Sequence, residues 1–131
     1  VTNSKTTAQY AHAEGFSTAQ GDYAHAEGFS SVAAGYYSHA EGKGTAAYRR
    51  SAHVFGEYNI TDTNGSTASD RGTYVEIVGN GTDGTHKSNI RTMDWSGNMA
   101  LAGSLTLGLG TADEVTITAA QLKALLGTPV R

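Results

Sequence analysis

Residues 10–15 read YAHAEG, a hexapeptide that recurs three times in the first half of the chain. The copies are YAHAEG at 23–28, YSHAEG at 37–42 and a degraded SAHVFG at 51–56. Their histidines are 13, 14 and 14 residues apart. A fixed period of this kind indicates a repeat architecture, in which each repeat contributes one structural unit and neighbouring units share a core.

A second motif separates the hexapeptides. It reads TAQG at 18–21, VAAG at 32–35 and AAYR at 46–49. Each repeat therefore contains two short segments joined by a few linking residues. The one-residue deficit of the first repeat falls between Gly15 and Ala19, where a loop can absorb it.

Small and polar residues alternate within each hexapeptide. Ala11, Ala13 and Gly15 share one parity, whereas His12 and Glu14 share the other. This period of two predicts strands, because a helix would need apolar residues at a spacing near 3.6 and would be weakened by regularly placed glycines. The hexapeptide glycines suit corners that need positive φ. We predict one coil per repeat, made of two short strands and two corners.

Large aliphatic side chains are nearly missing from the first sixty residues, where only Val1, Val32, Val54 and Ile60 are aliphatic and larger than alanine. Burial of alanine stabilises far less than burial of leucine, so this region cannot form a globular core of its own. Either it is disordered, or it stacks as a repeat and shares a core with neighbouring chains. Parity favours the second reading, with Ala, Ser and Gly inside a thin coil that associates about a closed symmetry axis.

Stacking of such coils places the polar residues of the hexapeptides in two outward rows. The histidine row is His12, His25, His39 and His53, and the glutamate row is Glu14, Glu27 and Glu41. Metal and acid–base sites need one converging cluster, whereas rows spread the same pair along an axis. We therefore predict structural ladders, with no catalytic residue, no metal ligand and no cofactor site, and we expect no enzymatic activity.

Aromatic residues also recur with the repeat. Tyr10, Tyr23 and Tyr37 form one set, and Phe16 and Phe29 form another. At equivalent corners each set would stack into an exposed stripe, which can either shield the coil or contact a receptor. These five residues are the candidate contacts for a receptor, either a glycan or a protein.

Large apolar residues return in the second half of the chain. We predict a polar linker or loop over 60–73, a β-hairpin region over 74–117 with turns at Asn80-Gly81, Asp83-Gly84 and Ser96-Gly97, and a helix over 118–127. Thr118 and Gln121 fit a capping box at the start of the helix. Gly127 and Pro129 are expected to end it.

The HAEG motifs, alternating with Thr-x-Ala-x-Gly-like motifs over residues 4–59, resemble the head repeats of trimeric autotransporter adhesins. They are still more similar to versions of these repeats in phage tail fibres and prophage minor structural proteins. The resemblance implies an all-β fold, with a trimeric left-handed parallel β-roll over 1–59. The stretches YVEIVGNGT at 74–82 and SNIRTMDWSGN at 88–98 resemble a module that follows such repeats in phage fibres, which implies an intertwined antiparallel β-hairpin region.

The function that this resemblance implies is a homotrimeric tail-fibre or related virion fibre segment, which is structural and takes part in host-surface attachment. Its other partners would be fibre or baseplate proteins of the virion. Two alternatives remain: a head fragment of a trimeric adhesin on a bacterial surface, and a carbohydrate-binding β-solenoid.

Composition excludes several other classes. The net charge is −3 and no basic run is present, which argues against nucleic-acid binding. No apolar stretch reaches the roughly 18 residues of a membrane span, so we predict no membrane insertion. The chain has no cysteine and therefore no disulfide framework or thiolate chemistry. Because it starts at Val1 without Met, we interpret it as a fragment or a processed product.

Overall fold

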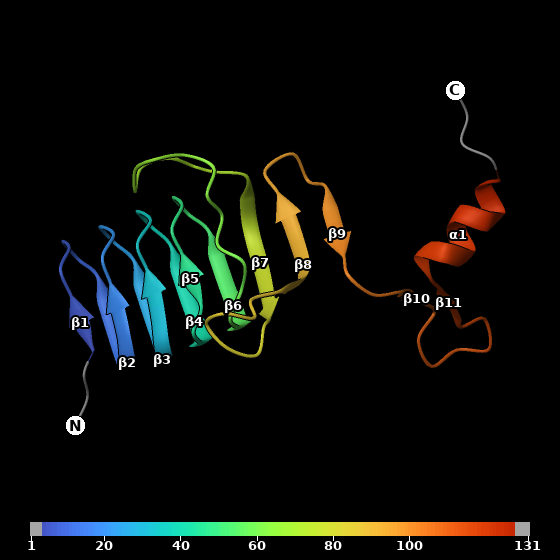
Figure 1. The fold of residues 1–131 in the computed structure, drawn as a ribbon, viewed down its shortest axis with the longest axis horizontal. Helices are drawn as coiled ribbons and strands as arrows, with labels where there is room; N and C mark the ends of the chain where they lie inside the picture. The colour runs from blue at the N-terminus through green and yellow to red at the C-terminus, as the bar shows by residue number, and fades with distance from the viewer. Residues whose placement is uncertain (1–3, 128–131) are drawn as a thin grey trace. The chain divides into compact units, whose positions relative to one another are not determined.

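The computed structural model describes residues 4–127, which form two compact units (Figure 1). Residues up to Ala100 belong to the first unit, and the second begins at Leu101. Pro129, predicted to follow the helix, lies outside the described residues. The strands of the first unit are β1 (Lys5–Thr6), β2 (His12–Ala19), β3 (His25–Ala33), β4 (His39–Lys43), β5 (Ala46–Ala47), β6 (His53–Glu57), β7 (Tyr74–Asn80) and β8 (Asn89–Asp94), with β9 (Met99–Leu101) at the boundary.

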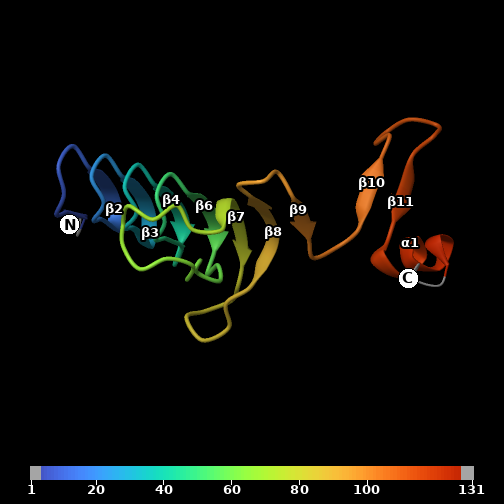
Figure 2. The ribbon, with the colours of Figure 1, turned by 90° about the horizontal axis from the view of Figure 1, so that it is seen from above.

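The predicted parallel β-solenoid is confirmed. The main sheet runs in the order β1-β2-β3-β4-β6-β7-β8-β9, with β5 paired to β3, and the pairs from β1 to β7 are parallel (Figures 1 and 2). His25 pairs with His39 and Gly28 pairs with Gly42, so that one coil corresponds to one 14-residue repeat. In the first repeat the register shifts between Phe16 and Thr18, which is where the deficit of one residue was predicted.

The interior of the solenoid is as thin as the parity predicted. One inward column consists of Ala13, Ala26, Ala40, Val54 and Ile77, which are paired in sequence across β2, β3, β4, β6 and β7. From Ala26 onward these side chains are fully buried. A parallel column on the other segment is Ala19, Ala33 and Ala47. Only the last two members of the column, Val54 and Ile77, are larger than alanine.

Buried hydroxyl groups share this interior, and each has a hydrogen-bond acceptor. The Ser17 hydroxyl donates to the carbonyls of Glu14 and Ala26 at 2.7 and 2.9 Å. Thr45 Oγ1 donates to Ser31 Oγ at 3.0 Å, one coil away. Burial of a hydroxyl without a partner costs about 1–3 kcal/mol, so these contacts make a polar interior tolerable.

Tyrosines occupy left-handed corners. Tyr10, Tyr23 and Tyr37 have φ of 56°, 59° and 60°, in addition to the positive φ expected of the hexapeptide glycines. Tyr37 N donates to the Asp22 carbonyl at 2.9 Å, and Tyr23 N donates to the Gln9 carbonyl at the same distance. The left-handed conformation thus joins each corner to the preceding coil. This hydrogen bond offsets a backbone strain of about 1–3 kcal/mol per residue.

The sheet extends beyond the repeats recognised in the sequence. The predicted roll ended at residue 59, and the following strand was assigned only to an antiparallel region. β7 pairs in parallel with β6, with Ile77 beside Val54 and Gly79 beside Gly56, and it pairs antiparallel with β8. The parallel sheet therefore continues for one strand past residue 59, because the chain leaves the solenoid through a long loop and returns to add another strand.

An asparagine ends the shorter side of the stack. Asn59 is 1% exposed, and its amide side chain accepts from Ala46 N at 2.8 Å and donates to the Ala46 carbonyl at 3.2 Å. These are the two groups that a further strand beside β5 would have paired. The side chain therefore takes the place of a missing rung and satisfies an otherwise open backbone edge.

The polar segment between β6 and β7 folds back along the coils (Figure 2). The Ala68 carbonyl accepts from Tyr36 N, and the Asp70 carbonyl accepts from Arg50 N. The Arg49 guanidinium donates to the carbonyls of Asp62 and Thr67 at 3.1 and 3.0 Å. Two arginines at the degraded end of the second motif thus attach this loop to the solenoid.

Asp62→Ala is expected to lower the free energy of unfolding by about 2 kcal/mol, because it leaves amides without an acceptor. The buried Asp62 carboxylate accepts from Thr73 N at 2.7 Å, Tyr74 N at 3.0 Å and Asn64 N at 3.0 Å. Urea unfolding followed by circular dichroism measures the change. Asp62→Asn keeps one oxygen acceptor and should lose less. Equal stability of Asp62→Ala and the unmodified chain would contradict this role.

The second unit is a small hairpin with a helix. β10 (Leu105–Leu107) pairs antiparallel with β11 (Val115–Ile117), and α1 (Ala119–Leu126) follows. The predicted capping box is present: Thr118 Oγ1 accepts from Gln121 N, and Gln121 Oε1 accepts from Thr118 N, both at 3.1 Å. Gly127 caps the C-terminus with φ of 75°. Within residues 101–127 only Ile117 is even partly buried.

Candidate functional site: the histidine and glutamate rows

The pleat of the strands directs the histidines and glutamates outward, and the register aligns them. Ring centroids are 4.9 Å apart for His12 and His25, 4.6 Å for His25 and His39, and 4.8 Å for His39 and His53. The last two pairs are nearly parallel, at 11°, whereas His12 meets His25 edge-on at 74°. The histidine row therefore consists of three stacked rings and one turned ring at its start.

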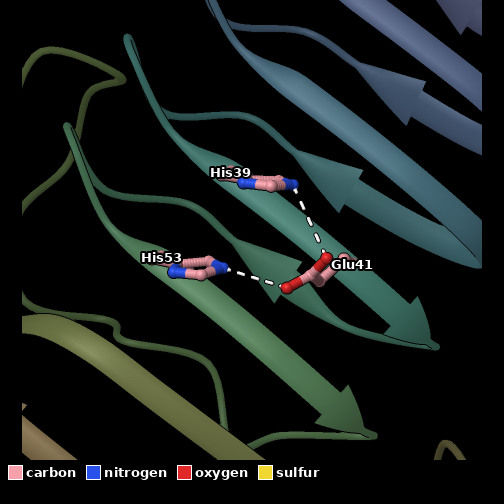
Figure 3. Close-up of side chains that lie close together, drawn as sticks. All are labelled: His39, Glu41 and His53. Atoms are coloured by element: carbon pink, nitrogen blue, oxygen red, sulfur yellow. Dashed lines mark hydrogen bonds and ion pairs between the residues drawn. The ribbon is translucent and has the colours of Figure 1, made fainter.

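The glutamate row lies beside the imidazole Nε2 atoms. Glu41 lies between two histidines, with Oε1 at 3.2 Å from His53 Nε2 and Oε2 at 3.9 Å from His39 Nε2 (Figure 3). Glu27 lies between His25 at 3.6 Å and His39 at 4.0 Å. Each of these two carboxylates thus bridges consecutive coils.

Carboxylates also interact along their own row. Hydrogen bonding with Glu41 and Glu14 raises the pKa of Glu27, since a proton on the middle carboxyl relieves repulsion from both neighbours. The same contact lowers the pKa of Glu41, and hydrogen bonding to His12 lowers that of Glu14. Desolvation, followed by repulsion from His25 and His53, lowers the pKa of His39. At the centre of the row, the pKa of Glu27 is therefore shifted upward and the pKa of His39 is shifted downward.

Two ring nitrogens in the row have no hydrogen-bond partner among residues 4–127. His25 Nε2 and His39 Nε2 are buried, and the carboxylate oxygens near them lie beyond hydrogen-bond distance. A buried nitrogen without a partner is unfavourable in either tautomer, because one tautomer leaves a donor and the other an acceptor unsatisfied. The row is consequently incomplete as a purely internal hydrogen-bond network.

An open groove of about 460 Å³ lies beside the glutamate row. It exists because glycines of the hexapeptides have no side chains to fill the space next to the carboxylates. A small cation or a ligand with several hydrogen-bond donors could therefore reach the row from solvent. The groove is lined by Glu14, Glu27, Glu41, Gly28, Gly42, Gly56 and Phe55.

The aromatic rows form the stacks that the repeat implies. Tyr10, Tyr23 and Tyr37 stack at centroid distances of 5.1 and 5.4 Å, and Phe16 stacks on Phe29 at 5.3 Å. These side chains are exposed, yet the interplanar angles of 16–24° mean that each ring covers the face of its neighbour. Sugar rings bind to aromatic faces, so the rows offer mainly edges and hydroxyl groups to a ligand.

The sequence predicted which residues form the histidine and glutamate rows, but it did not predict that His39, Glu41 and His53 lie close together. It also missed the loop contacts of Arg49, which depend on a segment that returns to the coils, and the capping role of Asn59, which directly follows the last hexapeptide strand. The degraded repeat at 46–49, where two arginines follow Tyr48, was the available signal. The absence of catalytic and cofactor residues stays a prediction.

Comparison with known proteins gives no relative. No protein-family model, no curated protein and no solved structure matches the chain. The β-solenoid therefore rests on the structure itself, and the likeness to phage fibres and adhesin heads rests on the repeat motifs. Among the described residues, no helix has the length and apolar character needed to cross a bilayer.

Proposed function

We propose that this chain is a segment of a homotrimeric fibre, a structural part of a phage or prophage tail fibre that contributes to host-surface attachment. The observation that carries the proposal is the second unit, whose described residues, 101–127, form a hairpin and a helix with no buried side chain among them. The motif resemblance adds the number of chains and the viral setting. Other fibre or baseplate proteins of the virion would be its neighbours in the particle.

The second unit presents its large apolar side chains to solvent. Leu109, Leu125 and Leu126 are 83%, 82% and 73% exposed, and Leu105 and Leu107 are about half exposed. An isolated eight-residue helix is marginal in water, and a lone two-stranded hairpin is equally so. Ordered elements of this kind need a partner that covers their apolar faces. Identical copies about a closed axis provide it without any additional protein.

The solenoid supports the same conclusion. Its interior holds alanines and hydroxyl groups, with Val54 and Ile77 as the largest fully buried apolar side chains. Burying an alanine removes little carbon from water, so each coil stabilises its neighbour weakly. Association with two further solenoids would bury the exposed aromatic rows and raise the buried area per chain. A thin solenoid is thus well suited to be one of the three chains of a fibre.

The alternatives differ in what they require. A bacterial trimeric adhesin would share the trimer, and the phage setting is favoured because the residues at 74–98 resemble a phage fibre module. A carbohydrate-binding solenoid would need accessible aromatic faces, and stacking covers both faces of Tyr23 and one face of Phe29. A virion location therefore remains the better proposal, with a host glycan or protein contacted by the fibre as a whole.

The mass of the full chain in solution tests the trimer. We expect light scattering coupled to size-exclusion chromatography to give three times the 13.6 kDa of one chain. The mass should not fall on dilution to low micromolar concentration, because the interface also supplies the core of the second unit. A stable, folded monomer would contradict the proposal, since residues 101–127 would then be ordered with their leucines in water.

Leu107→Asp is expected to dissociate the trimer, because each copy would bring a carboxylate into an apolar contact. The matched variant Thr106→Asp changes the adjacent residue, which points to the opposite face of β10, and should retain the trimeric mass. Sedimentation velocity of the two variants shows which face of β10 lies in the contact between copies. Dissociation by Thr106→Asp and not by Leu107→Asp would show that another surface holds the copies together.

A further inference from the structure

Three members of the rows converge on one point. His39 and His53 come from β4 and β6, which pair them directly, and Glu41 lies two residues after His39 (Figure 3). The ligand atoms of the three side chains all lie within 4.8 Å of one another. The rows were expected to spread equivalent pairs along the axis, but here two imidazole nitrogens face a single carboxylate.

The unpartnered nitrogen belongs to this group. His39 Nε2 is buried and has no hydrogen-bond partner in the part of the chain that the structure describes, while Glu41 Oε2 lies 3.9 Å away. A gap of this size is too long for a hydrogen bond and fits two donor atoms held on one ion, which lie at most about 4.2 Å apart when each bond is about 2.1 Å. His53 Nε2 and Glu41 Oε1 lie 3.2 Å apart, which is a hydrogen-bond distance that also falls within this limit.

The donor set defines the kind of ion. Two imidazole nitrogens and one carboxylate suit first-row divalent metals such as Zn²⁺, Co²⁺, Ni²⁺ and Cu²⁺. Ca²⁺ and Mg²⁺ prefer a shell made of oxygen atoms and would leave the imidazoles unused. We propose that His39, Glu41 and His53 form a site for a divalent transition metal, with its remaining coordination positions open to water or to an incoming ligand.

The position of this group in the row explains why it is favoured over its neighbours. The rings of His25 and His39 are as parallel as those of His39 and His53, but Glu27 lies 3.6 and 4.0 Å from the first pair, whereas Glu41 comes within 3.2 Å of His53 Nε2. Phe55 packs against the His53 ring at 5.1 Å and limits its rotation. The other convergent group, Glu14, His25 and Glu27, has one imidazole, and its Glu14 is exposed.

A metal at this place would join two consecutive coils through side chains of a single chain. The site is therefore independent of the proposed trimer, and each can fail without the other. It also lies at the edge of the open groove, where Glu41 and Gly42 form part of the wall. The open positions of the ion would face the solvent-filled groove rather than the alanine interior.

Calorimetric titration of the metal-free full chain with Zn²⁺, with no affinity tag attached, tests the site. We expect one strong site per chain, and His53→Ala should raise the Kd by about a factor of ten or more. His12→Ala removes an equivalent imidazole from the start of the row and should leave the Kd unchanged. Circular dichroism of both variants shows whether each retains the fold.

A second readout uses Co²⁺, whose visible absorption reports its ligands directly. Glu41→Gln keeps the size of the side chain and should alter the spectrum and weaken binding, while the trimeric mass stays the same. Absence of Zn²⁺ binding at micromolar concentration would overturn the proposal. So would equal weakening by His12→Ala and His53→Ala, or several equivalent ions per chain, because either result would mean diffuse binding along the row.

Discussion

Gly28→Ala is expected to lower the free energy of unfolding by about 4 kcal/mol or more, enough to prevent the solenoid from forming in a marginally stable chain. Gly28 has a φ of 105°, a conformation that L side chains rarely adopt. A Cβ atom at this position would lie 2.1 Å from the Gly42 carbonyl oxygen of the next coil. The obstacle is backbone, so it cannot rotate aside, and relief requires the two coils to separate.

Two further glycines distinguish the effect of positive φ from the effect of close stacking and provide a control. Gly35 has no positive φ, yet its Cβ would lie 2.1 Å from the Arg49 carbonyl oxygen, so Gly35→Ala tests close stacking alone. Gly84→Ala should change stability by less than about 0.5 kcal/mol, because no atom lies within 4 Å of its Cβ position. Urea unfolding monitored by circular dichroism compares all three. An unchanged midpoint for Gly28→Ala would mean that the coils do not stack in the described register.

The repeated part of the fold was predictable because its information is local and periodic. The spacing of the histidines gives the length of a coil, and the alternation of alanine with histidine and glutamate gives the inside and the outside. Ala26 and Ala40 are buried and His25 and His39 face outward for that reason. The short helix was equally accessible, since Thr118 and Gln121 form their capping box within a single turn.

The remaining features depend on contacts between residues that no period connects. β7 lacks the hexapeptide, and only Gly79 and an aliphatic residue at 77 match the preceding rung, after a loop of variable composition. The left-handed corners at Tyr23 and Tyr37 were unexpected, because glycine is the residue usually associated with positive φ. Their cost is offset by hydrogen bonds to the previous coil, which local sequence does not reveal.

The candidate site was predictable in its membership and not in its geometry. Register alone aligns the histidines and glutamates, and it treats every rung as equivalent. The difference between rungs arises from ring orientation only at the start of the row, where His12 meets His25 edge-on, because His25, His39 and His53 are all nearly parallel. It arises also from Phe55, which takes the place of the glutamate in the degraded repeat and packs on His53. The degraded repeat thus distinguishes His53 from the other histidines, and Glu41 comes within 3.2 Å of its Nε2 atom.

Ile77→Ala is expected to lower the free energy of unfolding by about 2–5 kcal/mol, because it removes the largest fully buried side chain and leaves a cavity at the end of the alanine column. The size of this effect tests whether β7 is a true rung of the solenoid. Ile60→Ala makes the same chemical change at a side chain that is 53% exposed, and it should have a much smaller effect. Urea unfolding gives both values under identical conditions.

The pairing of Ile77 with Val54 gives this test a sharper form. Side chains in contact usually show a coupling energy of about 0.5–3 kcal/mol when both are truncated, whereas independent sites add to within about 0.5 kcal/mol. Val54→Ala, Ile77→Ala and the double variant complete the cycle, because the register places these two residues side by side on β6 and β7. Additive losses would mean that β7 does not close the column. Coupling would show that a strand without the repeat motif completes the core that the repeats begin. The alanine coils bury little apolar surface, so the end of the stack needs larger side chains to shield it from solvent.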